Sequence, residues 1–219
     1  MPKPIIAVVL SGCGVYDGSE IHEAVLTLLA IDRHGAVARC FAPDVMQRDV
    51  VDHVTGEATG ERRNVLEESA RIARGKIDNL GSFDAATVDA LVFPGGFGAA
   101  KNLSSFAVDG PGCTVLPEVA RAIAAMMAAG KPVGALCIAP AILAKVLDGV
   151  ELTIGSDAGT AAALEKMGAH HKNAGHGEIV VDRAKKVVTT PCYMLDSAIG
   201  QVADGADRAV AALLEMVAR

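Results

Sequence analysis

Short apolar runs alternate with longer helical segments along most of this chain, and the alternation constrains the fold more than any other feature. Strands that alternate with helices build right-handed βαβ units, in which a parallel sheet is covered by helices on both faces. The five runs expected to share such a sheet are Ile5–Leu10, Val37–Ala42, Val88–Phe93, Val133–Leu136 and Lys186–Thr190. The helices predicted between and after them lie near Glu20–His34, Asn64–Arg74, Val115–Ala129, Ile138–Leu147 and from about Leu195 onward.

Three segments add detail to this pattern. Ile179–Asp182 and Lys186–Thr190 alternate in polarity around a charged turn, which predicts an antiparallel pair. Glu151–Ile154 begins a smaller strand–helix unit, and Val45–Arg63 is polar and irregular, with room for a small hairpin. Because no linker or internal repeat interrupts the chain, we expect a single domain over residues 1–219.

The composition narrows the class of protein. The chain is 51% hydrophobic but only 3% aromatic, so its core must be built from Ala, Val, Leu and Ile, as in a parallel sheet buried on both faces. A net charge of −6 argues against a nucleic-acid partner, and the apolar runs are far shorter than the ~20 residues needed to span a membrane. The N-terminal apolar run is too short for a signal peptide, and the five cysteines lack disulfide or zinc spacing. We therefore expect a cytoplasmic protein with reduced thiols.

Four turns are candidates for a site, because ligands of open α/β sheets bind where the carboxyl ends of the strands meet. Each turn is rich in glycine, contains cysteine or changes direction abruptly. The four turns are Ser11–Ser19, Pro94–Lys101, Leu136–Ile138 and Thr190–Met194.

Cys137 stands at an abrupt junction between a predicted strand and a predicted helix. The run Gly134–Pro140 has the pattern of a nucleophile elbow, with Cys where a hydrolase has Ser. The N–H groups and positive potential of a helix N-terminus favour a thiolate, so we expect a lowered pKa for this thiol and a strained backbone at Cys137. The elbow alone leaves a second interpretation open, an inert core cysteine.

Consecutive glycines in Pro94-Gly95-Gly96-Phe97-Gly98 follow a predicted strand. Such glycines let backbone N–H groups face an anion and so form an oxyanion hole, although a plain turn would use the same residues. The segment is not a phosphate loop, because it lacks the Walker spacing and a Ser or Thr after Lys101.

Glu20 and Glu23 lie three residues apart in the first turn of a predicted helix, and so on one face. A carboxyl held near a thiol can act as its acid/base partner, although acids in a first turn are also explained by the helix dipole alone. His22 between them is expected to point to solvent. His170, His171 and His176 lack the helical spacing and the nearby acids of metal ligands, so no metal site is expected.

Three segments resemble the bacterial ElbB, or enhancing lycopene biosynthesis, proteins: Ser11–Glu23, Pro94–Leu103 and Gly134–Pro140. The resemblance covers essentially the whole chain and places it in the DJ-1/PfpI superfamily. It implies a class I glutamine amidotransferase-like fold, which is a flavodoxin-like three-layer α/β sandwich with a mostly parallel sheet.

The resemblance also implies an activity: a glyoxalase that converts glyoxal, a small dicarbonyl substrate, into glycolate with no glutathione, metal or other cofactor. Deglycase activity on glycated proteins and a homodimeric assembly are left open. By motif, the nucleophile is Cys137, the acid/base is Glu20, and the oxyanion-binding N–H groups are those of Gly96 and Ile138. We therefore predict that Glu20 rather than Glu23 lies within hydrogen-bonding reach of the Cys137 sulfur, and that burial beside the thiol raises the pKa of Glu20 so that it stays protonated near neutral pH.

One departure from the family pattern affects the expected rate. Many relatives carry His directly after the nucleophile or after the next strand, where this chain has Ile138 and Gly155-Ser156-Asp157. Glutamine hydrolysis by a Cys-His-Glu triad is therefore not expected, and glyoxal turnover should be slow. Two alternatives stay open: a non-enzymatic stress or redox sensor that works through oxidation of Cys137, and a regulator linked to isoprenoid biosynthesis. No Asp-rich or Arg-rich diphosphate motif supports direct catalysis on prenyl phosphates.

Overall fold

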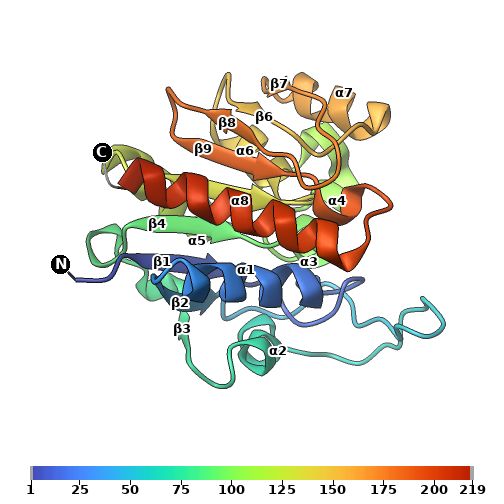
Figure 1. Cartoon of the computed structure of the whole chain (residues 1–219). Coiled ribbons are helices and arrows are strands. Elements are labelled where there is room, and N and C mark those ends of the chain that lie inside the picture. The colour runs from blue at the N-terminus through green and yellow to red at the C-terminus, as the bar shows by residue number, and fades with distance from the viewer. Residues whose placement is uncertain (1, 218–219) are drawn as a thin grey trace.

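Seven strands form one sheet in the order β3-β2-β1-β4-β5-β9-β8 (Figure 1). This arrangement is taken from a computed structural model that describes residues 2–217. All neighbouring strands run parallel except β8, which is antiparallel to β9, as predicted. The strands are β1 (Ile5–Val9), β2 (Val37–Ala42), β3 (Ile77–Asn79), β4 (Ala90–Phe93), β5 (Val133–Leu136), β8 (Val180–Asp182) and β9 (Val187–Thr190).

The five strands predicted to share the sheet do so. The short edge strand β3 was not predicted, because only three residues pair there and its sequence, Ile-Asp-Asn, has little strand character. The strand predicted at Glu151–Ile154 is shorter, and it pairs outside the main sheet. This small parallel pair consists of β6 (Glu151–Leu152) and β7 (His170–His171).

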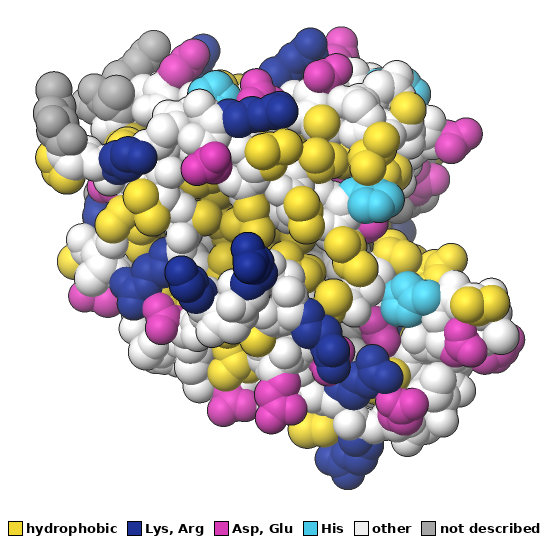
Figure 2. All heavy atoms as spheres, turned by 60° about the horizontal axis from the view of Figure 1, so that its bottom comes forward, with side chains coloured by type: hydrophobic (Ala, Val, Ile, Leu, Met, Phe, Trp, Pro, Cys, Tyr) yellow, Lys and Arg dark blue, Asp and Glu magenta, His cyan; other side chains and the backbone are white. Residues whose placement is uncertain are grey.

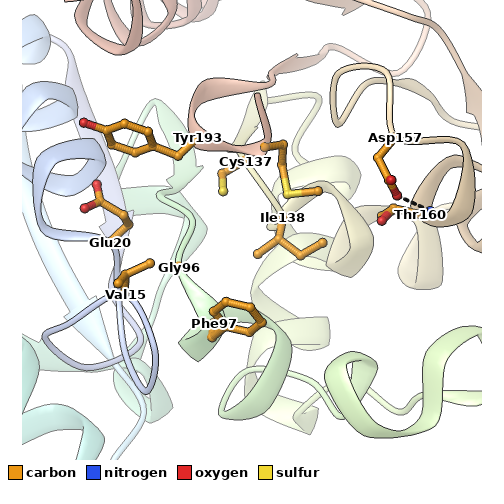
Figure 3. A pocket seen from close by; sticks show the side chains of 10 residues that line it. Val15, Glu20, Gly96, Phe97, Cys137, Ile138, Asp157, Thr160 and Tyr193 are labelled. Carbon is orange, nitrogen blue, oxygen red and sulfur yellow. Dashed lines mark hydrogen bonds between the residues drawn. The ribbon is translucent and has the colours of Figure 1, made fainter. Parts of the chain in front are cut away.

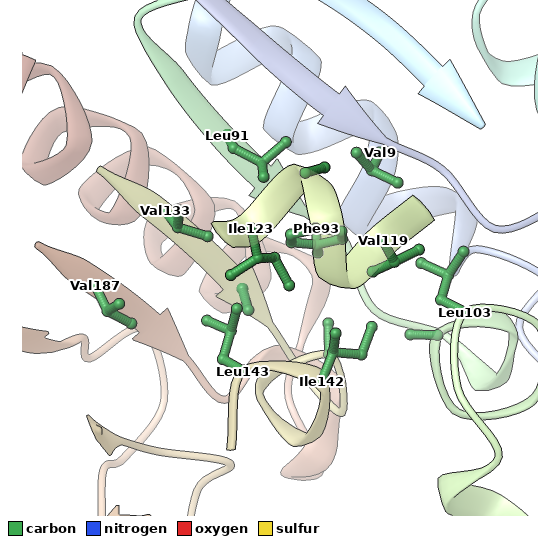
Figure 4. Packing of buried hydrophobic residues seen from close by; sticks show 14 of the residues in the cluster. Val9, Leu91, Phe93, Leu103, Val119, Ile123, Val133, Ile142, Leu143 and Val187 are labelled. Atoms are coloured by element: carbon green, nitrogen blue, oxygen red, sulfur yellow. The ribbon is translucent and has the colours of Figure 1, made fainter. Parts of the chain in front are cut away.

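Helices cover both faces of the sheet, since alternate residues of each strand point to opposite sides. In β1, Ile6 and Val8 join a buried cluster with α1, α2 and α8, whereas Ala7 and Val9 join a cluster with α5 and α6. Figure 4 shows Val119 and Ile123 of α5 packed over the sheet in that second cluster. The helices are α1 (Ile21–Arg33), α2 (Val65–Ile72), α3 (Phe97–Lys101), α4 (Phe106–Asp109), α5 (Pro117–Ala128), α6 (Pro140–Val146), α7 (Ala158–Lys166) and α8 (Ile199–Val217).

The polar segment Val45–Arg63 leaves the body of the sheet and is held by two isolated antiparallel bridges, Met46–Asn64 and Val51–Ala58. The predicted hairpin is thus reduced to single bridges. On the side that this segment faces, both signs of charge are interspersed with apolar side chains (Figure 2). Within residues 2–217, no helix has the length and hydropathy needed to cross a membrane.

The order of the strands fixes where a ligand can bind. From β1 the chain builds outward through β2 and β3, then returns to the other side of β1 with β4, β5 and β9. The direction in which successive strands are added to the sheet therefore reverses between β1 and β4. The loops that follow these two strands diverge and leave a crevice there. The turns after β1, β4, β5 and β9 are the four predicted from the sequence.

Candidate active site

Cys137 occupies the turn between β5 and α6. Its φ is 58°, a left-handed value that costs energy for a residue with a side chain. Its N–H donates to the carbonyl oxygen of Thr190 at 2.9 Å, which ties the turn to the end of β9. The prediction of a strained elbow is confirmed, and the side chain is 7% exposed.

The glycine loop after β4 packs its backbone directly against Cys137. A Cβ added at Gly95 would lie 3.0 Å from the Cys137 sulfur and 2.5 Å from Oε2 of Glu23, so the contact requires glycine. Gly96 has a φ of 96°, and its N–H hydrogen-bonds to the Cys137 sulfur. The N–H of Ile138 does the same from the other side of the turn. The two N–H groups expected to bind an oxyanion therefore meet at the sulfur.

Glu23 is the carboxyl that contacts Cys137, so the prediction that Glu20 would do so is wrong. Glu23 is fully buried and hydrogen-bonds to the Cys137 thiol. Oε2 of Glu23 accepts from the N–H of Gly95 at 2.9 Å, and Oε1 accepts from the N–H of Tyr193 at 3.2 Å. Three loops thus hold one carboxyl in place.

The position of the helix start explains the exchange of roles. Glu20 is the N-cap of α1, and its carboxylate turns back to accept the N–H of Glu23 at 2.7 Å. One turn further along, Glu23 points inward toward the sheet. Glu20 instead lines the cavity beside the site.

Burial dominates the electrostatics of this pair. It raises the pKa of Glu23 from 4.5 to about 8, and the nearby charge of Glu20 adds to the shift, although the N–H groups of Tyr193 and Gly95 oppose it. Near neutral pH Glu23 therefore holds its proton, whereas the sequence predicts this property for Glu20.

The pKa of the Cys137 thiol is also raised, first by burial and then by the charge of Glu23, whereas the N–H groups of Gly96 and Ile138 lower it. The lowered pKa expected from the helix N-terminus is wrong in direction, because desolvation outweighs two hydrogen bonds. The thiol can lose its proton by passing it to Glu23 once that carboxyl is ionised.

A cavity of about 460 Å³ opens over the sulfur (Figure 3). Among the described residues that line it there is no His, Lys or Arg, and no cluster of metal ligands occurs anywhere in the described part of the chain. The lining residues are Val15, Glu20, Gly96, Phe97, Cys137, Ile138, Asp157, Thr160, Tyr193 and Met194.

Sequence reasoning placed most of this wall in the four predicted turns, but it did not assign the roles of the side chains there. Tyr193 holds Glu23 with its N–H, and its hydroxyl lies 2.9 Å from Nδ1 of His22. The side chain of His22 is exposed, as predicted. Asp157 and Thr160 enter from the start of α7, a helix far along the chain. Thr190–Met194 was predicted as a site turn, but the sequence carries no signal for which of its side chains faces the cavity.

No family model matches the chain. Among curated proteins, the human protein named glutamine amidotransferase-like class 1 domain-containing protein 3, mitochondrial, is 51% identical across 100% of this chain and 86% of its own length. The rat ES1 protein homolog, mitochondrial, is 50% identical with the same coverage, and the zebrafish ES1 protein, mitochondrial, is 35% identical over 98% of this chain.

Solved structures agree with these similarities. An isoprenoid biosynthesis protein with an amidotransferase-like domain from Ehrlichia chaffeensis superposes with a TM-score of 0.91 at 38% identity, over 97% of this chain and 99% of that one. A DJ-1 superfamily protein from Salmonella typhimurium matches with a TM-score of 0.61 at 22% identity, over 97% of this chain and 91% of that one. The second likeness concerns the fold alone.

Proposed function

Because the chain belongs to the ElbB/ES1 family of the DJ-1/PfpI superfamily, we propose that it is a glyoxalase that converts glyoxal into glycolate without glutathione or metal. One observation carries the proposal: a buried, hydrogen-bonded Glu23–Cys137 pair faces two N–H groups at the floor of a cavity. A thiol, an acid/base group and donors for an oxyanion are what this reaction requires.

In the first step the Cys137 sulfur attacks one aldehyde carbon of glyoxal. Ionised Glu23 takes the thiol proton and passes it to the carbonyl oxygen, while the N–H groups of Gly96 and Ile138 stabilise the developing oxyanion. A carbon–sulfur bond forms, the carbonyl π bond becomes an O–H bond, and Glu23 is a carboxylate again. The product is a thiohemiacetal on Cys137.

In the second step Glu23 removes the C–H proton from the thiohemiacetal carbon and returns it to the neighbouring carbon through an enediol, while the hydroxyl proton of the first carbon moves to the oxygen of the second. One carbon is oxidised to a thioester and the other is reduced to an alcohol, so no external oxidant or reductant is needed. Water then cleaves the carbon–sulfur bond, which releases glycolate and restores the Cys137 thiol.

The protonation state of Cys137 favours a glyoxalase over a redox sensor. A sensor thiol must be accessible and ionised at neutral pH. Burial raises the pKa of Cys137, so the thiol is protonated at neutral pH and would react slowly with peroxide. The base that a substrate reaction needs is supplied by Glu23, which contacts the sulfur directly.

The names of the relatives suggest two further activities that the cavity does not favour. A prenyl diphosphate would need cationic partners, and the described residues that line the cavity include no Lys or Arg. Glutamine hydrolysis by a Cys-His-Glu triad would need a histidine, which is also missing from those residues.

The oligomeric state of this protein and its cellular compartment stay predictions. The homodimer can be tested by sedimentation of the purified protein. The three vertebrate relatives are named mitochondrial, whereas the sequence of this chain predicts a cytoplasmic protein. Fractionation of cells that produce the full protein would decide between the two compartments.

The test is steady-state conversion of glyoxal by protein freed of glutathione and treated with a chelator, with glycolate identified by NMR. We expect glycolate at a turnover at or below the low end of the ~1–10³ s⁻¹ usual for enzymes, because no histidine assists. Cys137→Ala should abolish the reaction, whereas Cys13→Ala, which removes a partly exposed thiol, should retain it. Full activity in Cys137→Ala would mean that other nucleophiles react, and an inactive wild-type protein would favour the sensor.

A further inference from the structure

Two hydrogen bonds join Tyr193 to consecutive residues in the first turn of α1. Its N–H donates to Oε1 of Glu23 at 3.2 Å, and its hydroxyl lies 2.9 Å from Nδ1 of His22. The rings of His22 and Tyr193 lie 5.9 Å apart between their centroids, so the two side chains also pack against each other. The 3-10 turn Cys192–Met194 is therefore pinned to α1 at two neighbouring positions.

The turn that presents this N–H is short and strained. Cys192 has a φ of 45°, a left-handed value that costs energy for a residue with a side chain. Because the hydrogen bonds within a 3-10 turn have poor geometry, the shape of the turn depends on contacts from outside it. Ser197 supplies one by donating its hydroxyl to the carbonyl oxygen of Cys192 at 3.0 Å. His22 supplies another on the side that faces Glu23.

Glu23 depends on this N–H in order to ionise. Burial raises the pKa of Glu23 to about 8, and among the groups that lower the pKa the N–H of Tyr193 has the largest effect. The charge of Glu20 opposes ionisation, whereas the Cys137 thiol and the N–H of Gly95 assist it less than Tyr193 does. The titratable side chains around Glu23 are His22 and Glu20 on α1, Cys137 after β5, and Cys192 and Tyr193 after β9.

The hydroxyl of Tyr193 is not placed to react with a substrate at the thiol. Figure 3 shows the Tyr193 side chain extending away from Cys137, and its hydroxyl contacts His22 instead. The side chain of His22 is 53% exposed and does not line the cavity over the sulfur. Any effect of this pair on the reaction therefore passes through Glu23.

From this arrangement we propose that His22 and Tyr193 are positioning residues for Glu23. The bond between their side chains keeps the Tyr193 N–H on the carboxylate, which stabilises the ionised form that accepts the thiol proton of Cys137. The effect on turnover rests on the proposed function, whereas the effect on the ionisation of Glu23 does not.

The first test is the pH profile of kcat/KM for glyoxal in Tyr193→Phe, which keeps the ring and the N–H but loses the hydroxyl. Because a hydrogen bond to a charged group is weakened, the rising limb should move to higher pH by about one unit. Near neutral pH kcat/KM should fall by up to about tenfold, and above the new limb it should approach the wild-type value. An unchanged profile, or an equal loss at every pH, would overturn the proposal.

His22→Ala removes the other half of the contact and should give the same shift. His22→Asn should restore most of the wild-type profile, because its amide can take the place of Nδ1 and accept from the Tyr193 hydroxyl. In the double variant His22→Ala with Tyr193→Phe, the shift should be no larger than in either single variant, since both remove one contact. Additive shifts would mean that the two side chains act separately and would contradict the proposal.

His34→Ala is the matched control. Nε2 of His34 lies 3.0 Å from Oδ1 of Asp207, so this contact also joins a surface histidine of the α1 region to a later element, here α8. His34 stands at the end of α1 opposite Glu23, and its loss should leave the pH profile in place. A shift as large as that of His22→Ala would show that any loosening of α1 moves the profile, which would overturn the positioning role.

A titration that needs no turnover separates this proposal from the glyoxalase. The isotopically labelled carboxyl carbon of Glu23, assigned by its loss in Glu23→Gln, reports ionisation directly by NMR. Its midpoint should lie near the pKa of about 8 in the wild-type protein and higher in Tyr193→Phe and His22→Ala. If the midpoint shifts but no glyoxal is converted, the glyoxalase proposal is wrong and the positioning role stands. If glyoxal is converted and the midpoint does not shift, the positioning role is wrong and the glyoxalase proposal stands.

Discussion

The carboxyl of Glu23, in the first turn of α1, is hydrogen-bonded to the thiol of Cys137 at the end of β5. Both groups are buried, and burial raises the pKa of each. The pair therefore keeps its protons near neutral pH, and ionised Glu23 is the group placed to accept the thiol proton. The predictions that follow depend on this contact.

The two glutamates of α1 should differ sharply in their effect on activity. Glu23→Gln removes the acid/base group and should lower kcat/KM by about 10²–10⁴-fold. Glu20→Gln should cost much less, because an amide oxygen can still accept the N–H of residue 23 and cap the helix. The measurement is kcat/KM for glyoxal in both variants, and a larger loss in Glu20→Gln would restore Glu20 as the acid/base.

Activity should rise with pH through about 8. Glu23 must be ionised to take the thiol proton, and its pKa is about 8, so kcat/KM should fall by about tenfold for each pH unit below that value. The apparent pKa belongs to the coupled Glu23–Cys137 pair. The pH profile of wild-type protein measures it, and a profile that is flat from about pH 6 to about pH 9 would contradict the assignment.

Glu20→Gln provides an internal check of the pH profile. The charge of Glu20 is one of the causes that raise the pKa of Glu23. Its removal should shift the rising limb to lower pH, while Glu23→Gln should remove that limb. No shift in Glu20→Gln would mean that the two carboxyls do not interact.

Glu23 should also make stability depend on pH. The pKa of Glu23 is about 8 in the folded protein and 4.5 ordinarily. The protonated carboxyl therefore makes its full contribution to the stability of the folded protein below pH 4.5, and this contribution is lost as the pH rises to about 8. At about 1.4 kcal/mol per pKa unit, the loss amounts to several kcal/mol. The stability of Glu23→Gln relative to wild type should therefore increase between these pH values in urea unfolding. A constant or decreasing difference would contradict the raised pKa.

Gly95→Ala should damage both the fold and the site. The added Cβ would lie 2.5 Å from Oε2 of Glu23 and 3.0 Å from the Cys137 sulfur, so the pair must separate. We expect a loss of about 1–3 kcal/mol from overpacking, together with a large fall in kcat/KM. Gly112→Ala is the control, because its Cβ meets no atom within 4 Å, and its stability should change by no more than ~0.5 kcal/mol. Wild-type activity in Gly95→Ala would show that the contact is not needed.

The elements of the sheet could be predicted because their signals are local. The runs that became β1, β2, β4, β5 and β9 are apolar and bounded by turn residues, so each carries its own evidence. The strand β3 and the helix α3 were not found, since three to five residues hold too little pattern. The positions of these two short elements depend on contacts with neighbouring elements; β3, for example, is held by its pairing with β2.

The sequence by itself determined the fold class, the elbow at Cys137 and the glycines that bring backbone N–H groups to its sulfur. These follow from the order of apolar runs and from residues that tolerate unusual backbone angles, and both are local properties. Only the tertiary structure decided that Glu23 rather than Glu20 reaches the thiol, because a one-residue difference in where α1 begins sets which carboxyl caps the helix and which points inward. It also decided the direction of the Cys137 pKa shift, since burial depends on every segment that closes over the site.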